Sequence, residues 1–179
     1  MKWLSVAIVS MAVGVGVSAD EPAIRVERRV RPLDMWAVEA FDRGRARSAV
    51  IRSLIDTLEQ SDLIVHVQTV TTLPQGTAGQ MRLSYDAGLC RYVRIHLQRS
   101  LLPDERAAIL AHELQHAVEV AQSSARSNQA VRELFERIGR HAGSDNVFDT
   151  TAARVAGIKA WSELRGVPVP AHMRTLSRD

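Results

Sequence analysis

The sequence predicts one domain of the α+β class. Three β-rich runs lie together in the middle of the chain, and runs with the period of an amphipathic helix lie before and after them. The 179 residues are 46% hydrophobic and 24% charged, which is the composition of a globular protein long enough to bury a core. We therefore expect a helix, then a small sheet of three or four mostly antiparallel strands, then three further helices.

The first residues have the features of a secretory signal. Lys2 supplies a positive charge, an apolar run follows over residues 3–17, and small residues precede Asp20. We predict that residues 1–19 are a signal peptide cleaved after Ala19, so that the mature protein is periplasmic or secreted. An uncleaved membrane anchor is the alternative, although the apolar run is short for a membrane span.

The segment that follows is predicted to add little to the fold. Residues 20–42 have mixed charge and one apolar cluster, so we expect them to wrap the domain surface or to be partly loose. The first helix is predicted over residues 44–60, where apolar side chains recur on one face.

Three runs predict the sheet. Residues 63–70 are rich in β-branched side chains and read as a strand. Residues 80–85 and 90–98 alternate polar and apolar side chains, and a turn signal at residues 86–88 separates them. These two runs predict a hairpin within a largely antiparallel sheet.

The helix after the sheet has a clear start. Pro103 suits a first helical turn, and the two acidic residues after it favour the positive end of the helix dipole. Residues 106–121 contain no glycine or proline, and their apolar side chains form a face that can pack on the sheet.

Two more helices complete the predicted domain. The first covers residues 129–138 and the second runs from about residue 148 to residue 165. We place the domain limits at residues 43–166, with a short polar tail at residues 167–179.

The helix after the sheet contains an H-E-x-x-H motif at residues 112–116. His112 and His116 are one helical turn apart, so both imidazoles can bind one Zn²⁺. Glu113 then lies beside the metal, where it can take a proton from a water that the metal activates. We predict that the two histidines are zinc ligands and that Glu113 is the catalytic general base.

Zinc requires a third protein ligand, and three residues are candidates. We predict Asp149, at the start of the last helix, with an N-cap as its alternative role. His141 is the second candidate ligand. Glu119 lies on nearly the same helix face as His112 but a turn beyond the metal, so it is either a hydrogen-bond partner of a ligand imidazole or a surface charge.

This motif, with the acidic-x-x-Ala pattern that begins at Asp149, resembles the gluzincins, particularly their small single-domain forms. The resemblance implies a zincin-like fold over about residues 43–165, in which a later helix carries an acidic ligand. It also implies that His112, His116 and Asp149 bind zinc and that Glu113 is the general base. Gluzincins have glutamate at the third position, where this chain has aspartate.

These residues predict zinc-dependent hydrolysis of an amide bond in a peptide or protein substrate. An extended peptide could pair with an exposed sheet edge near the site. Tyr85, Tyr92 and His141 are candidates for stabilising the transition state. The alternative is a non-catalytic zincin-like module of the cell envelope that binds zinc or a protein partner.

The remaining features indicate no second function. The net charge of +3 is small and spread along the chain, and no basic block is interleaved with aromatic residues, so we expect no nucleic-acid partner. No segment beyond the signal is apolar enough to predict membrane contact. Cys90 is the only cysteine, which excludes an internal disulfide, and we expect its thiol to be inert. His66 and His96 are predicted to be half-buried structural histidines.

Overall fold

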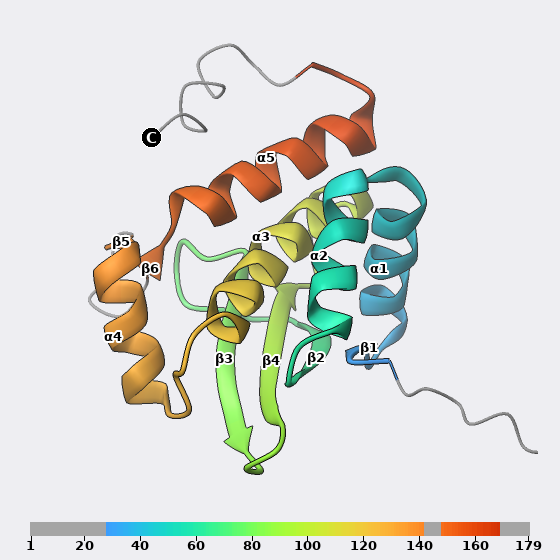
Figure 1. Cartoon of the computed structure of the whole chain (residues 1–179). Helices are drawn as coiled ribbons and strands as arrows, with labels where there is room; N and C mark the ends of the chain where they lie inside the picture. Colours follow the sequence, from blue (N-terminus) through green and yellow to red (C-terminus); the bar gives the residue numbers. More distant parts are fainter. Residues whose placement is uncertain (1–27, 142–147, 169–179) are drawn as a thin grey trace, which may run out of the picture.

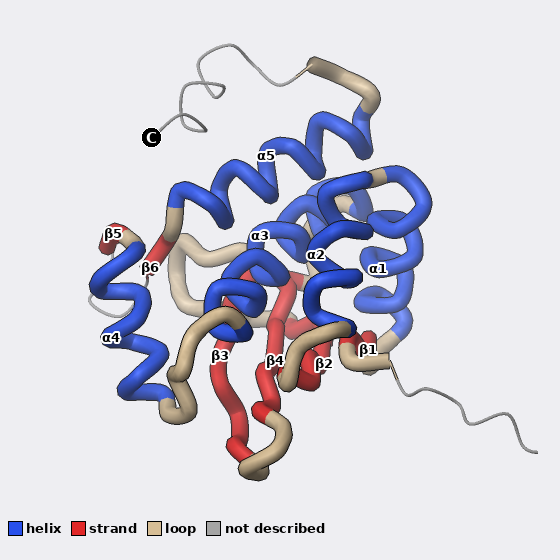
Figure 2. The backbone as a smooth tube through the Cα atoms, viewed as in Figure 1, coloured by secondary structure: helices blue, strands red, loops and turns tan. Residues whose placement is uncertain are grey.

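The computed structural model describes residues 28–141 and 148–168, so the predicted signal peptide and most of the tail lie outside the described residues. Helices cover one face of a four-stranded sheet (Figure 1, Figure 2), and the α+β class is confirmed. In chain order the elements are β1 (Val30–Pro32), α1 (Met35–Arg47), α2 (Ala49–Glu59), β2 (Leu63–Val70), β3 (Gly79–Asp86), β4 (Arg91–Gln98), α3 (Pro103–Ala121), α4 (Asn128–Ile138), β5 (Arg140–His141), β6 (Phe148–Asp149) and α5 (Thr151–Arg165). Among these helices, none combines the length and apolar character that a membrane span needs.

The sheet is mixed, so the prediction of a mostly antiparallel sheet was wrong. Its strand order is β1-β2-β4-β3, in which β1 and β4 both run parallel to β2 and only β3 is antiparallel to its neighbour. The predicted β3–β4 hairpin is present, but it places β4 between β2 and β3. The α1–α2 pair forms the crossover that a parallel β1–β2 connection requires. As a result, β3 is an edge strand.

The N-terminal segment belongs to the fold from Val30 onward, which corrects the expectation of a wrapping or loose segment. Val30 is fully buried and pairs with Val65 of β2. Asp34 caps α1 by accepting the N–H groups of Trp36 and Ala37, and it also accepts the N–H of Thr69 at 2.6 Å. The aspartate therefore joins the start of α1 to the end of β2.

The single helix predicted over residues 44–60 is two helices, because Ser48 is extended at φ −123° and ψ 120°. Its hydroxyl oxygen accepts the N–H of Ile51 at 3.2 Å, which begins α2, and its O–H donates to Glu163 of α5 at 2.6 Å. The predicted later helices are confirmed, although α5 begins at Thr151 rather than near residue 148.

Helix α3 is the centre of the domain, packed against the sheet and against α5. A buried arginine anchors each end. Arg91 of β4 pairs with Asp62 through two hydrogen bonds of 2.7 and 2.8 Å. It also donates to four carbonyl groups at the C-terminal end of α3 and just beyond it, those of Val120, Ala121, Ser123 and Ala125. The last carbonyls of a helix lack N–H partners four residues on, and they form the negative end of its dipole, so the buried cation stabilises this end of α3.

The other anchor is Arg106, in the first turns of α3. It is 2% exposed, pairs with Glu39 of α1 at 3.0 Å, and stacks over the Trp36 ring at 5.2 Å. It also donates to the carbonyls of Arg99 and Leu101, which immediately precede the helix. Both ends of α3 are thus fixed relative to the sheet and to α1.

We predict that Asp62→Asn destabilises the fold in a pH-dependent way. The hydrogen bond from Arg91 holds the pKa of Asp62 below its ordinary value. The stabilisation is therefore present above the ordinary pKa of about 4 and is lost as the pH falls through the lower folded value. Urea denaturation at pH 7 should show a loss of about 1–3 kcal/mol, which shrinks on acidification.

The control is Asp56→Asn, because Asp56 is exposed on α2 and has no ion-pair partner in the described part of the chain. It should leave the free energy of unfolding within about 0.5 kcal/mol of the parent. An Asp62→Asn protein as stable as the parent at pH 7 would contradict the assigned role of the pair.

Candidate metal centre

The structure brings together the three side chains predicted to bind zinc. His112 and His116 project from α3, and Asp149 lies in β6 immediately before α5. One ligand atom from each lies within 4.8 Å of the others. Helix α5, which follows Asp149, packs on α3 beside the motif, and an added Cβ at Gly157 would stand 3.4 Å from the Cβ of His112, which is ordinary van der Waals contact.

Two of the donor–donor distances are close to those of a tetrahedral site. The Nε2 atoms of His112 and His116 are 3.2 Å apart, and His112 Nε2 is 3.5 Å from Asp149 Oδ1. Two donors at about 2.0–2.2 Å from a tetrahedral zinc are about 3.3–3.6 Å from each other. Asp149 Oδ1 is buried and has no hydrogen-bond partner among the described residues. A buried carboxylate oxygen without a partner is costly, and a cation would compensate it.

Asp149 is not the cap of the last helix. Thr150 is the N-cap, and its hydroxyl oxygen accepts the N–H of Ala153 at 3.0 Å. Asp149 instead lies 3.4 Å through Oδ2 from Nε of Arg154, one turn into α5. This leaves Oδ1 directed toward the histidines. The alternative role of Asp149 as an N-cap was therefore wrong.

Glu119 is the hydrogen-bond partner of a histidine rather than a free surface charge. Its Oε2 lies 2.9 Å from Nδ1 of His116, and its Oε1 accepts the hydroxyl of Thr150 at 2.7 Å. With Nδ1 donating to this carboxylate, the Nε2 of His116 keeps its lone pair for a metal. The edge of the Phe135 ring, 5.1 Å away between centroids, also packs on His116. The contact between Glu119 and Thr150 links the motif helix to the start of α5.

The electrostatics keep one imidazole neutral. Burial, together with the neighbouring His116 and Arg154, lowers the pKa of His112 to about 4. Burial also opposes protonation of His116, but the hydrogen bond to Glu119 and the nearby carboxylates outweigh it and raise the pKa of that imidazole. His112 is therefore neutral and a ready ligand at neutral pH, whereas protonation of His116 competes more strongly with metal binding.

Glu113 lies between the motif helix and the edge strand. It is 5% exposed. Burial raises the pKa of its carboxyl to about 7, against the opposing charge of His116, while Asp149 adds to the rise and the N–H of Met81 counters it. A Cβ at Gly79 would stand 2.6 Å from Oε1 of Glu113 and 2.6 Å from Cγ2 of Ile109. Only glycine allows the β3 backbone to lie this close to the carboxylate.

These groups open onto a cleft of about 590 Å³. Its walls are the β3 edge with the loop before it, helices α3 and α4, and β6. The apolar part of the lining consists of Ile109, Val131, Phe135, Phe148 and Met81. Among the described strands, the edge strand β3 pairs only with β4. Its residues 79–82 line the cleft.

The structure does not bring the two tyrosine candidates to this cleft. Tyr85 and Tyr92 do not line it, and they lie opposite each other in the β3–β4 pairing, on the outward face of the sheet. The backbone of His141 pairs with Phe148 in the small β5–β6 sheet. Its side chain lies outside what the structure describes, so the proposals for His141 as a ligand or a stabilising group concern an undescribed side chain.

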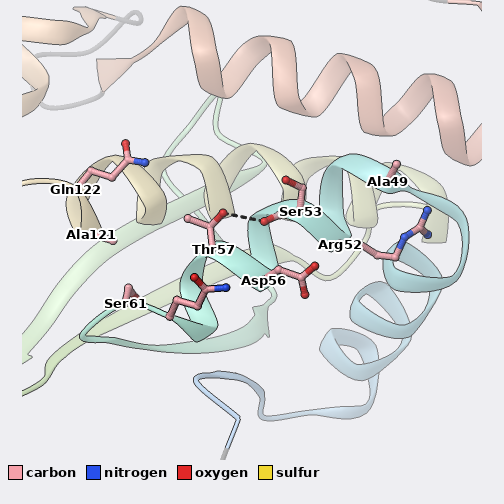
Figure 3. A pocket seen from close by; sticks show the side chains of 9 residues that line it. Ala49, Arg52, Ser53, Asp56, Thr57, Ser61, Ala121 and Gln122 are labelled. Atoms are coloured by element: carbon pink, nitrogen blue, oxygen red, sulfur yellow. Dashed lines mark hydrogen bonds between the residues drawn. The ribbon is translucent and has the colours of Figure 1, made fainter.

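A second hollow of about 580 Å³ lies between α2 and the C-terminal end of α3 (Figure 3). Its side chains are mostly small or polar, and the Thr57 hydroxyl is bonded to the Ser53 carbonyl of the same helix at 2.9 Å. Asp56 is its one acidic residue and no histidine or cysteine lines it. The hollow therefore lacks the donor set of a metal site.

No protein-family model, no curated protein and no solved structure matches this chain. Interpretation of the site therefore depends on the geometry of its own residues.

We predict that zinc affinity depends on both Asp149 and Glu119, but to different degrees. Asp149→Ala removes a donor and should abolish tight binding. Glu119→Gln weakens the orientation of His116 and should lower affinity by about 10- to 100-fold. Competition with a chromophoric chelator measures both constants.

Glu133→Gln is the matched control for the zinc measurements, because Glu133 is an exposed residue of α4 whose carboxylate accepts a hydrogen bond from Gln129. It should bind zinc as the parent does. Unchanged zinc affinity in Asp149→Ala would exclude Asp149 as the third ligand and direct attention to His141.

Proposed function

We propose that this protein is an exported zinc-dependent hydrolase in the form of a small metallopeptidase. The observation that carries the proposal is the donor set: the unpartnered buried oxygen of Asp149 lies 3.5 Å from Nε2 of His112, which lies 3.2 Å from Nε2 of His116. Glu113 stands beside this set at the cleft, in the position that an H-E-x-x-H general base requires.

The residues have distinct roles in the proposed reaction. Bound Zn²⁺ would supply a Lewis acid that polarises the scissile carbonyl and acidifies a water. Glu113 removes the proton of the attacking water and then transfers it to the leaving amine. Gly79 and the N–H of Met81 hold the carboxylate against β3, so the base has one orientation.

The edge strand supports a peptide as the substrate. Strand β3 is the sheet edge beside the cleft, and an extended chain could pair with its backbone groups other than the Met81 N–H that Glu113 accepts, as β-augmentation requires. The apolar wall of Val131, Phe135 and Phe148 can accept a side chain of such a peptide. A peptide bound in this way would present a backbone amide to the donor set and Glu113.

The relationship to gluzincins and the zincin-like character of the fold are part of the same proposal. Their support is the combination of an H-E-x-x-H helix under an edge strand with an acidic residue that precedes a later helix. Export is supported by the charged, apolar and small residues at the start of the sequence.

One observation favours a second candidate, a non-catalytic module that binds zinc or a protein. The cleft lining, as far as the chain is described, contains no tyrosine and no histidine besides the two of the motif. A side-chain donor for the developing oxyanion is thus not identified there, although the arginines, threonine and amides of the lining are polar.

Glu113→Gln distinguishes the two functions. The amide keeps the shape of the carboxylate but cannot accept the proton, so the variant should keep its zinc and lose about 10²- to 10⁴-fold in cleavage rate. A peptide-library cleavage assay, with metal content measured on the same samples, checks both. Equal cleavage by Glu113→Gln and the parent would refute the catalytic assignment, whereas zinc binding without cleavage in either would favour the binding module.

Gly79→Ala tests how Glu113 is positioned. The added Cβ would meet Glu113 and Ile109, so kcat should fall while zinc content is kept. Gly44→Ala is the control for tight packing. Its Cβ would stand 2.7 Å from Cδ1 of Ile51, and neither residue lines the cleft. It should lower the melting temperature without lowering kcat. An unchanged kcat in Gly79→Ala would contradict the positioning role.

A further inference from the structure

A row of basic side chains crosses the outward face of the four-stranded sheet. Register places Arg31 of β1 beside His66 of β2, His66 beside Arg94 of β4, and Arg94 beside Arg82 of β3. We call these four residues the basic row. With strands about 4.8 Å apart, the row extends over about 14 Å.

The strands place no carboxylate beside Arg82 or Arg94 on the outward face. The outward positions of β1 to β4 contain no aspartate or glutamate, since Asp86 falls opposite the inward-facing Arg91. Arg82 and Arg94 are exposed, and neither forms an ion pair with a described residue. Burial and the flanking arginines lower the pKa of His66. The positive charge of the face therefore comes from arginine at neutral pH.

Aromatic rings lie next to the basic row. The ring centroids of Tyr92 and His66 are 6.1 Å apart, and those of Tyr85 and Tyr92 are also 6.1 Å apart. A bulge between Leu83 and Tyr85 shifts the β3–β4 register, so that Tyr85 rather than Ser84 lies opposite Tyr92. Tyr85 is 65% exposed as a result. The bulge thus adds a ring to the outward face.

We propose that this sheet face binds single-stranded nucleic acid, with phosphates on the basic row and bases stacked on Tyr92 and Tyr85. Arginines beside exposed aromatic rings are the combination that such ligands require. A lipid surface is less well matched, because none of the exposed side chains on this face is aliphatic. An acidic peptide would use the arginines but would leave the rings without a role.

The proposal departs from the expectation based on the linear sequence. The arginines and rings come from four separate strands, so no continuous segment shows basic residues interleaved with aromatic ones. Only the strand register brings them together. The face is also separate from the metal donor set, although Arg82 lines the cleft as well.

Fluorescence anisotropy with a labelled oligothymidine of about 12 nucleotides tests the proposal, within the site sizes known for such proteins. The protein is the mature chain treated with chelator, so the outcome does not depend on zinc or on hydrolysis. We expect saturable binding at low salt. Tyr92→Leu should weaken it by about 5- to 150-fold. Arg94→Gln should weaken it and reduce the slope of log K against log salt by about 0.7.

Arg52→Gln is the matched control, because it removes the same charge from an exposed position on α2. It should bind the oligonucleotide as the parent does, and circular dichroism melting should show all three variants folded. An abasic oligomer of equal length tests the contribution of the bases, and we expect it to bind at least about 5-fold more weakly.

Three results would overturn the proposal. The first is no binding of the oligothymidine at low salt. The second is equal binding of the abasic oligomer, together with no effect of Tyr92→Leu. The third is that the protein binds anionic phospholipid vesicles or polyglutamate but does not bind oligothymidine. None of these results would bear on the proposed hydrolase, which Glu113→Gln tests separately.

Discussion

The structure depends on the placement of three ionisable side chains in its central helix, the buried Glu113 and His116 and the half-buried His112. Helix α3 has to pack on the sheet and on α5, yet the face that does so carries these groups. Burial of a polar group is costly unless it finds a partner. Glu119 satisfies His116, and the N–H of Met81 reaches Glu113. These contacts do not occupy the ligand atoms of His112, His116 and Asp149 that lie within 4.8 Å of one another, and such a group of donors is what a metal site requires.

Segments that are far apart in the sequence position the donor set together. The edge strand approaches Glu113 closely because residue 79 is glycine, and α5 packs against α3 at the level of His112. The two buried arginines at the ends of α3 fix the helix along its axis, and the bond from Thr150 to Glu119 fixes the segment that carries Asp149. The helix, the edge strand and β6 are thereby held in one arrangement, as a site that binds a ligand by preformed geometry requires.

Local sequence patterns predicted the residues of the site, but they did not predict the topology of the sheet. The spacing of His112 and His116 on a helix was visible in the sequence, and so was the candidacy of Asp149. The strand β1 was missed because its three residues give no alternation that can be recognised. The break at Ser48 and the parallel pairing of β2 with β4 were missed because both depend on contacts between distant segments. For the same reason, no sequence pattern could show that Gly79 lies against Glu113.

The sheet separates two proposed activities, with hydrolysis at the β3 edge over α3 and binding of single-stranded nucleic acid on the outward face. The central claim is that the donor set of His112, His116 and Asp149 binds zinc. Zinc K-edge X-ray absorption of the zinc-loaded chain tests it most directly. We expect the scattering pattern of two imidazoles, with nitrogen and oxygen donors at about 2.0–2.2 Å. Fewer than two imidazoles, or a sulfur donor at about 2.3 Å, would contradict the account.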